Sequence, residues 1–154
     1  MGRKVTFTVS AWSAASPAVI YDLLCSGATW PQWSPLGSFR LEREGREGGE
    51  SLGAIRVFTT AGVHSREELV GFEPGRSFSY SALSGLPIRD HRADVTLTER
   101  DGGTAIAWRE DFRAKVPGTG WFYERSLRWF VQRCADGLAR HAASLDGQEA
   151  RAGR

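Results

Sequence analysis

Residues 118–145 read GTGWFYERSLRWFVQRCADGLARHAASL, and the fold of the chain depends on this stretch. Apolar or weakly polar side chains recur at steps of three and four, at Tyr123, Leu127, Phe130, Cys134, Leu138, His141 and Leu145. This spacing places them on one face of a helix. Pro117 marks the break before the helix, no proline follows, and Trp121 adds aromatic bulk near its start. The helix must therefore pack its apolar face against the rest of the chain.

The composition is that of an ordinary globular domain. The chain has 154 residues, 41% hydrophobic and 25% charged, which predicts one domain over residues 1–145 and a flexible polar tail over 146–154. A formal charge of +2 is too even to predict nucleic acid as a partner. The sequence predicts no stable membrane insertion, because no apolar run is long enough. We expect a cytoplasmic protein whose Cys25 and Cys134 are free thiols, and its oligomeric state stays open.

The remaining sequence predicts one strand, two short helices and six further strands. Val5, Phe7 and Val9 alternate with polar residues, which indicates the first strand. Ser16 is the expected cap of a helix that starts at Pro17, and a short turn with two tryptophans follows. Short alternating runs separated by glycine-rich turns predict strands at 38–44, 52–60, 63–73, 76–84, 90–99 and 104–114. We therefore expect an α+β fold in which a curled, seven-stranded antiparallel sheet wraps around the C-terminal helix.

The alternation within these strands predicts which side chains face the helix. Tyr80, Val95, Trp108 and Phe112 belong to the apolar set of their strands, and pairing across the intervening turns places them on one face. Together with Leu127 and Phe130 of the helix, we expect them to line an internal cavity.

The same alternation carries charged residues inward. Folding at the Pro74-Gly75 turn places Val70 opposite Tyr80, so that Arg66 and Glu68 share the inner face with Val70. His91 and Glu110 follow from their own strands, as diagonal neighbours with Glu110 opposite Ala93. A β-bulge or an open sheet end would also explain single residues of this set. Their occurrence together suggests a polar patch in an apolar cavity, as in a small-molecule site.

Four segments resemble one known superfamily. They are SAASPAVIYDLLCSGATWPQWSP (13–35), LVGFEPGRSFSYSALSGLPIRDHRADVTL (69–97), GGTAIAWREDF (102–112) and PGTGW (117–121). With the order of elements, they resemble a bacterial branch of the START-like, polyketide cyclase/dehydrase and lipid-transport superfamily (SRPBCC), which has the helix-grip fold. The resemblance implies a deep cavity between helix and sheet, with its mouth framed by loops near 59–63, 84–90 and 114–120. It does not fix an activity, because the scaffold serves carriers, receptors, cyclases and lyases.

The sequence contains no motif for a cofactor or a metal, and no nucleophile in a usual setting. The run from His64 to Glu68 lies on a strand and lacks the helical spacing of a zinc protease motif. We therefore expect no cofactor, no metal and a hydrophobic small-molecule ligand such as a lipid, polyketide or polycyclic compound. The candidate ligand-binding residues are Arg66, Glu68, Tyr80, His91, Val95, Trp108, Glu110, Phe112, Trp121, Leu127 and Phe130.

Three functional hypotheses remain open at this point. Binding or transport of the ligand is favoured, because the polar groups need only hold its polar end. The alternative is a polyketide cyclase or dehydratase that uses His91 and Glu110 as its acid and base, since burial shifts the pKa of such groups. A protein-interaction or regulatory role is the third.

Overall fold

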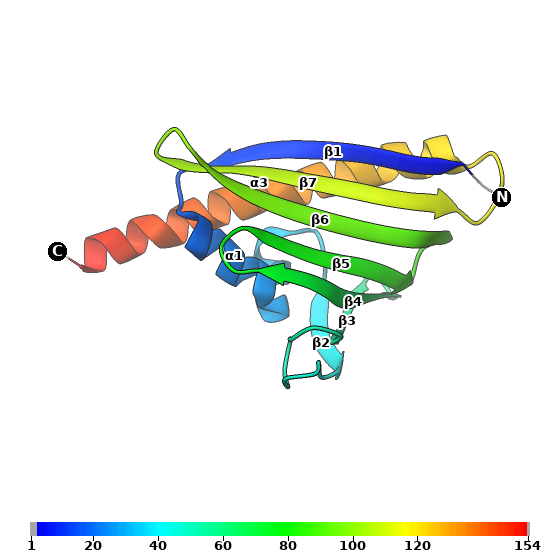
Figure 1. Cartoon of the computed structure of the whole chain (residues 1–154), viewed down its shortest axis with the longest axis horizontal. Helices are drawn as coiled ribbons and strands as arrows, with labels where there is room; N and C mark the ends of the chain where they lie inside the picture. Colours follow the sequence, from blue (N-terminus) through cyan, green and yellow to red (C-terminus); the bar gives the residue numbers. More distant parts are fainter. Residues whose placement is uncertain (1–2, 154) are drawn as a thin grey trace.

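In the computed structural model, which describes residues 3–153, the seven strands of this region form one antiparallel sheet in the order β1-β7-β6-β5-β4-β3-β2 (Figure 1). The elements in chain order are β1 (Lys4–Ser13), α1 (Pro17–Cys25), the 3₁₀ turn η1 (Gly27–Thr29), α2 (Trp30–Trp33), β2 (Ser38–Arg43), β3 (Ile55–Thr60), β4 (Val63–Glu73), β5 (Ser77–Ser84), β6 (Ile88–Arg100), β7 (Gly103–Ala114) and α3 (Gly120–Ala152). The predicted fold class and order of elements are confirmed. Ser16 caps α1 as expected, its hydroxyl accepting from the Val19 N–H at 3.4 Å.

The C-terminal helix is longer than the sequence predicted. Its helical structure continues through residues 146–152, which were expected to form a polar tail after Leu145. This segment contains no proline, and its single glycine, Gly147, costs a helix only about 1 kcal/mol relative to alanine. The polar composition after Leu145 therefore does not mark the end of the helix.

Helix α3 lies along the β1 and β7 side of the sheet and crosses α1 and α2 (Figure 1). The Ser13 hydroxyl on β1 donates to the Ala139 carbonyl at 2.7 Å, which ties strand and helix together in the core. At Gly137 the helix touches α2 so closely that a Cβ atom would lie 1.8 Å from the Trp33 carbonyl oxygen. These contacts fix α3 against β1 and α2, and Gln132 adds a hydrogen bond to the Ser10 carbonyl of β1 at 3.1 Å.

The core between the helices and the sheet centres on Trp30. Its ring lies 4.6 Å from Trp33, 5.8 Å from Trp108 and 5.9 Å from Tyr80, measured between ring centroids, and its indole N–H donates to the Leu24 carbonyl at 3.1 Å. Trp30 is 1% exposed. The short α2 thus places a large ring over the middle of the sheet, where it fills the space beneath one half of α3.

A β-bulge in β4 changes which of its residues face the helix. Phe72 pairs with Phe78 as predicted, but Leu69, not Val70, pairs with Tyr80. Val70 is the extra residue, and it reverses the alternation of β4 on its N-terminal side. Consequently Glu67 faces inward and its neighbours in sequence face outward.

Candidate ligand pocket

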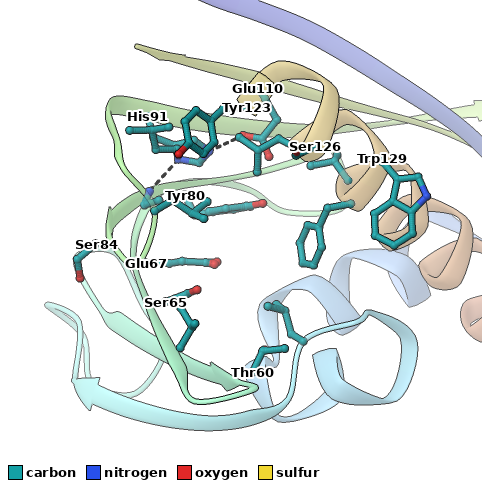
Figure 2. Close-up of a pocket in the computed structure, with 18 of the residues that line it drawn as sticks. Thr60, Ser65, Glu67, Tyr80, Ser84, His91, Glu110, Tyr123, Ser126 and Trp129 are labelled. Carbon is teal, nitrogen blue, oxygen red and sulfur yellow. Dashed lines mark hydrogen bonds and ion pairs between the residues drawn. The ribbon is translucent and has the colours of Figure 1, made fainter. Parts of the chain in front are cut away.

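A cavity of about 910 Å³ lies between the N-terminal half of α3 and the strands β3–β7 (Figure 2). Its apolar walls are formed by Trp30, Leu36, Val63, Ala82, Leu86, Ile88, Phe122, Leu127, Trp129, Phe130 and Val131. Its polar lining consists of Thr60, Ser65, Glu67, Tyr80, Ser84, His91, Glu110, Tyr123, Arg125 and Ser126. A pocket of this volume has room for a molecule of several rings or a long chain.

The structure brings five of the eleven candidate residues to the cavity wall, namely Tyr80, His91, Glu110, Leu127 and Phe130. Val95, Trp108 and Phe112 face inward as predicted but lie in solid core, each 0% exposed. Trp30 and Trp33 pack onto Trp108 and occupy the space at this end of the sheet, which is why the cavity does not reach it. Trp121 is 68% exposed.

The mouth is partly where the sequence placed it. Thr60 and Val63 come from the β3–β4 hairpin, and Leu86 comes from the β5–β6 connection, as expected. The predicted third part, residues 114–120, does not line the cavity, and the first turns of α3 take its place through Phe122 and Trp129.

The predicted inward orientation of Arg66 and Glu68 is wrong, because the bulge at Val70 turns both to the outer face. There Arg66 pairs with Glu42, its Nη2 atom 2.6 Å from the carboxylate, and Glu68 lies 3.6 Å from Arg43. Both ion pairs are partly exposed, and neither residue lines the cavity.

Glu67 is the cavity residue that the sequence analysis missed. Its side chain is 8% exposed and points into the cavity beside Tyr80 (Figure 2). Burial raises the pKa of Glu67 to about 7; Arg56 and His91 counteract this shift, and Glu110 adds to it. The sequence was ambiguous at this point. Leu69 is as apolar as Val70, so the alternation that places Glu67 inward fitted β4 as well as the one that places Glu68 inward.

His91 and Glu110 meet inside the cavity, as predicted from the pairing of Ala93 with Glu110. The His91 Nε2 atom shares a short hydrogen bond with Glu110 Oε2, and both side chains are buried. A bulge at Asp90, which has φ of 52°, precedes His91 at the inner face. On its other side His91 accepts the Ala82 backbone N–H at Nδ1, 2.8 Å away. Because an amide N–H can only donate, this bond requires a lone pair on Nδ1 and places the ring proton at Nε2.

Opposing effects set the charge of His91. Burial lowers the pKa of the imidazole, while the hydrogen bond and the charge of Glu110 raise it, with the net result above the usual value. Protonation of the second nitrogen must displace the Ala82 N–H. The pair is thus held in place from both sides.

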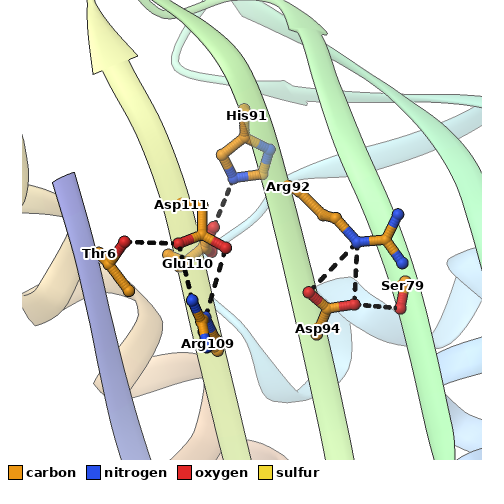
Figure 3. A network of polar contacts seen from close by, with 8 residues as sticks. All are labelled: Thr6, Ser79, His91, Arg92, Asp94, Arg109, Glu110 and Asp111. Carbon is orange, nitrogen blue, oxygen red and sulfur yellow. Dashed lines mark hydrogen bonds and ion pairs between the residues drawn. The ribbon is translucent and has the colours of Figure 1, made fainter. Parts of the chain in front are cut away.

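Successive residues of β6 and β7 separate an inner and an outer polar network (Figure 3). On the outer face Asp111 accepts from the Thr6 hydroxyl at 2.6 Å and lies 3.4 Å from Arg109. Burial raises the pKa of Asp111, but the hydrogen bonds from Thr6 and Arg109 and the Arg109 charge outweigh it and hold this pKa below its usual value. Asp94 likewise accepts from Ser79 at 2.6 Å. These carboxylates have donors of their own, so they stabilise the sheet and leave the inner acids as the groups available to a ligand.

We expect the Glu110→Gln substitution to lower the pKa of His91, because it removes the charge that raises it. NMR titration of the histidine ring signals measures the effect directly. His64, which is exposed and hydrogen-bonded to Thr59, gives a reference signal in the same spectra. An unaltered His91 titration would contradict the coupling seen in the structure.

The described residues, 3–153, hold no cluster of three or more His, Cys, Asp or Glu side chains that could bind a metal. No helix of the described region is long and apolar enough to cross a membrane. What the arrangement offers a bound molecule is a large apolar surface with hydrogen-bonding groups in its depth.

A curled antiparallel sheet closed by a long C-terminal helix around an internal cavity defines a helix-grip domain. The profile of the "Polyketide cyclase / dehydrase and lipid transport" family matches residues 4–144. The chain therefore belongs to this family, as its resemblance to the START-like superfamily implied. Both activities in the family description concern hydrophobic small molecules, which supports hydrophobic-ligand binding in general.

Solved structures share the fold at low sequence identity. The ginseng major latex-like protein from Panax ginseng is 12% identical with a TM-score of 0.77, over 92% of this chain and 99% of its own. A START superfamily protein from Mycobacterium smegmatis is 16% identical with a TM-score of 0.74, over 94% and 99%. The di-domain ARO/CYC protein StfQ of the steffimycin biosynthetic pathway is 18% identical with a TM-score of 0.72, over 98% of this chain but 52% of its own. No curated protein sequence matches.

Proposed function

We propose that the protein binds or carries a hydrophobic small molecule of the lipid, polyketide or polycyclic type in the cavity beneath α3. The observation that carries this proposal is the cavity itself, about 910 Å³ with mostly apolar walls. Burial of apolar ligand surface against these walls favours binding by about 25 cal/mol of free energy for each Å² removed from water. The aromatic side chains at the mouth, Phe122 and Trp129, are 51% and 62% exposed and extend the apolar surface outward.

A fluorescent anilinonaphthalene dye and its displacement by fatty or polycyclic compounds test the proposal. We expect the dye to bind, and we expect Ala82→Phe to weaken binding about tenfold or more, a loss of about 1.4 kcal/mol, because the ring fills the cavity. Thr8→Phe is the matched control, since it adds the same ring at an exposed position of β1. Equal dye binding by all three proteins would place the dye elsewhere and contradict the proposal.

A polyketide cyclase or dehydratase activity is the second candidate, and the buried His91–Glu110 pair favours it. Proton transfer to a ligand by His91 requires breaking a bond to Ala82 or Glu110, because both ring nitrogens are engaged. The unpaired carboxylate of Glu67 is the more accessible base. The test is turnover of a polyketide substrate by the unaltered protein and by His91→Ala. If the variant still binds the substrate but no longer converts it, the protein is an enzyme and not only a carrier.

A further inference from the structure

Glu67 is a buried acid without a hydrogen-bond donor among the described residues. Its carboxylate points into the cavity, and no side-chain hydrogen bond or ion pair is formed with it in the region 3–153. A carboxylate buried at this depth must take up a proton, be solvated by water in the cavity, or receive a donor from a bound molecule.

The groups around Glu67 do not supply that donor. The titratable groups that face it are Arg56 on β3, Tyr80 on β5, His91 on β6, Glu110 on β7, and Cys134 and Arg125 on α3. Each buried member of this set is already engaged, is itself an acid, or makes no bond to Glu67.

Arg56 is a buried cation directly opposite Glu67 in the β3–β4 register, but its guanidinium is bound to other groups. Its Nη2 atom donates to the Leu24 carbonyl at 3.0 Å and to the Cys25 carbonyl at 2.6 Å, at the end of α1. Its Nε atom lies 2.8 Å from the Glu50 carboxylate. Arg56 does not line the cavity, and among the described residues that do, Arg125, exposed on α3, is the one arginine or lysine.

We propose that the ligand is an apolar molecule whose polar end is a hydrogen-bond donor, above all a cationic amine, received by Glu67 in the depth of the cavity. This inference rests on the proposed function and adds the chemical class of the ligand. Two acids, Glu67 and Glu110, face the cavity, so a carboxylate head at that depth meets like charges. An ammonium group or a hydroxyl donor instead completes the hydrogen bonding of Glu67.

Three probes with one ring system separate these head groups: naphthylmethylamine, naphthylmethanol and naphthoate. Their affinities are measured by calorimetry at about pH 8, where an alkylamine is still a cation because its pKa is about 10. We expect the amine to bind about tenfold tighter than the alcohol, and the carboxylate to bind weakest. Lowering the pH to about 6 should reduce the preference for the amine, because Glu67 takes up a proton.

Two variants assign the preference to Glu67. In Glu67→Gln, which keeps the size of the side chain, the amine should lose its advantage over the alcohol and the pH dependence should disappear. In Glu68→Gln, the matched control on the outer face, the order of affinities should stay as in the unaltered protein. Thermal unfolding of both variants verifies that they are folded.

The outcomes distinguish this inference from the function on which it rests. If none of the probes binds and the anilinonaphthalene dye does not bind either, the proposed function fails. Tightest binding of naphthoate, weakened by Arg125→Gln, would show that the ligand head lies at the mouth; the carrier function would stand and the inference would be overturned. An amine preference that persists in Glu67→Gln overturns it as well.

Discussion

Replacing Trp30 with alanine is expected to lower the free energy of unfolding by about 3–5 kcal/mol, as for other large aromatic residues removed from a core. Trp30 is 1% exposed and lies 5.6 Å from Phe58 in addition to its contacts with Trp33, Trp108 and Tyr80. Its indole N–H bond to Leu24 is lost as well. Urea denaturation followed by circular dichroism measures the change.

Trp121→Ala is the matched control for this substitution. Trp121 is the same residue type but is 68% exposed at the start of α3, so its removal should change the free energy of unfolding by no more than about 0.5 kcal/mol. A comparable loss in both variants would mean that Trp30 is not the centre of the core.

The second large effect concerns the pH dependence of stability. Glu67 has a pKa of about 7 in the folded protein against a usual value of 4.5. At low pH Glu67 is protonated in both the folded and the unfolded protein, so its burial involves no charge and does not lower the stability. As the pH rises from about 4.5 to about 7, the unfolded chain loses its proton first, so stability falls. The difference between the two pKa values corresponds to about 3 kcal/mol, reached above about pH 7.

Glu67→Gln should therefore become more stable relative to the unaltered protein as the pH rises. We expect the difference in unfolding free energy between the two proteins to grow by about 3 kcal/mol from about pH 4 to about pH 8. Chemical denaturation at a series of pH values measures it, with Glu68→Gln, the same substitution at a partly exposed residue, as the control. A constant difference for Glu67→Gln would show that its carboxylate is already satisfied.

The periodicity of the sequence was sufficient to predict the architecture. The helical stripe through Leu127, Phe130 and Leu138 and the alternation in the later strands are signals that hydrophobic burial enforces, because the opposite arrangement exposes apolar surface. The meeting of His91 with Glu110 was predictable for the same reason, since a tight turn fixes the register of the two strands.

Two features of the site were not predictable in this way. The position of the bulge at Val70 is not visible in the pattern, because Leu69 and Val70 are both apolar and local alternation does not decide between them. The extent of the cavity depends on Trp30 and Trp33 of the short helix α2, whose rings pack against Trp108 of β7 and fill the space there. Neither follows from local alternation, which is why Glu67 was missed and Val95, Trp108 and Phe112 were assigned to the cavity wall.

The bulge at Val70 also bears on how this family member could change during evolution. Loss of the single codon for Val70 would remove the extra residue and leave Leu69 opposite Tyr80, so Glu67 would keep facing the cavity. Loss of Glu68 with the bulge retained would instead turn Glu67 outward and bring Arg66 to the inner face, which exchanges an acid for a cation without any substitution in the pocket. Insertions and deletions in β4, more than point mutations, are then the changes to examine when related sequences are compared for the charge they present to a ligand.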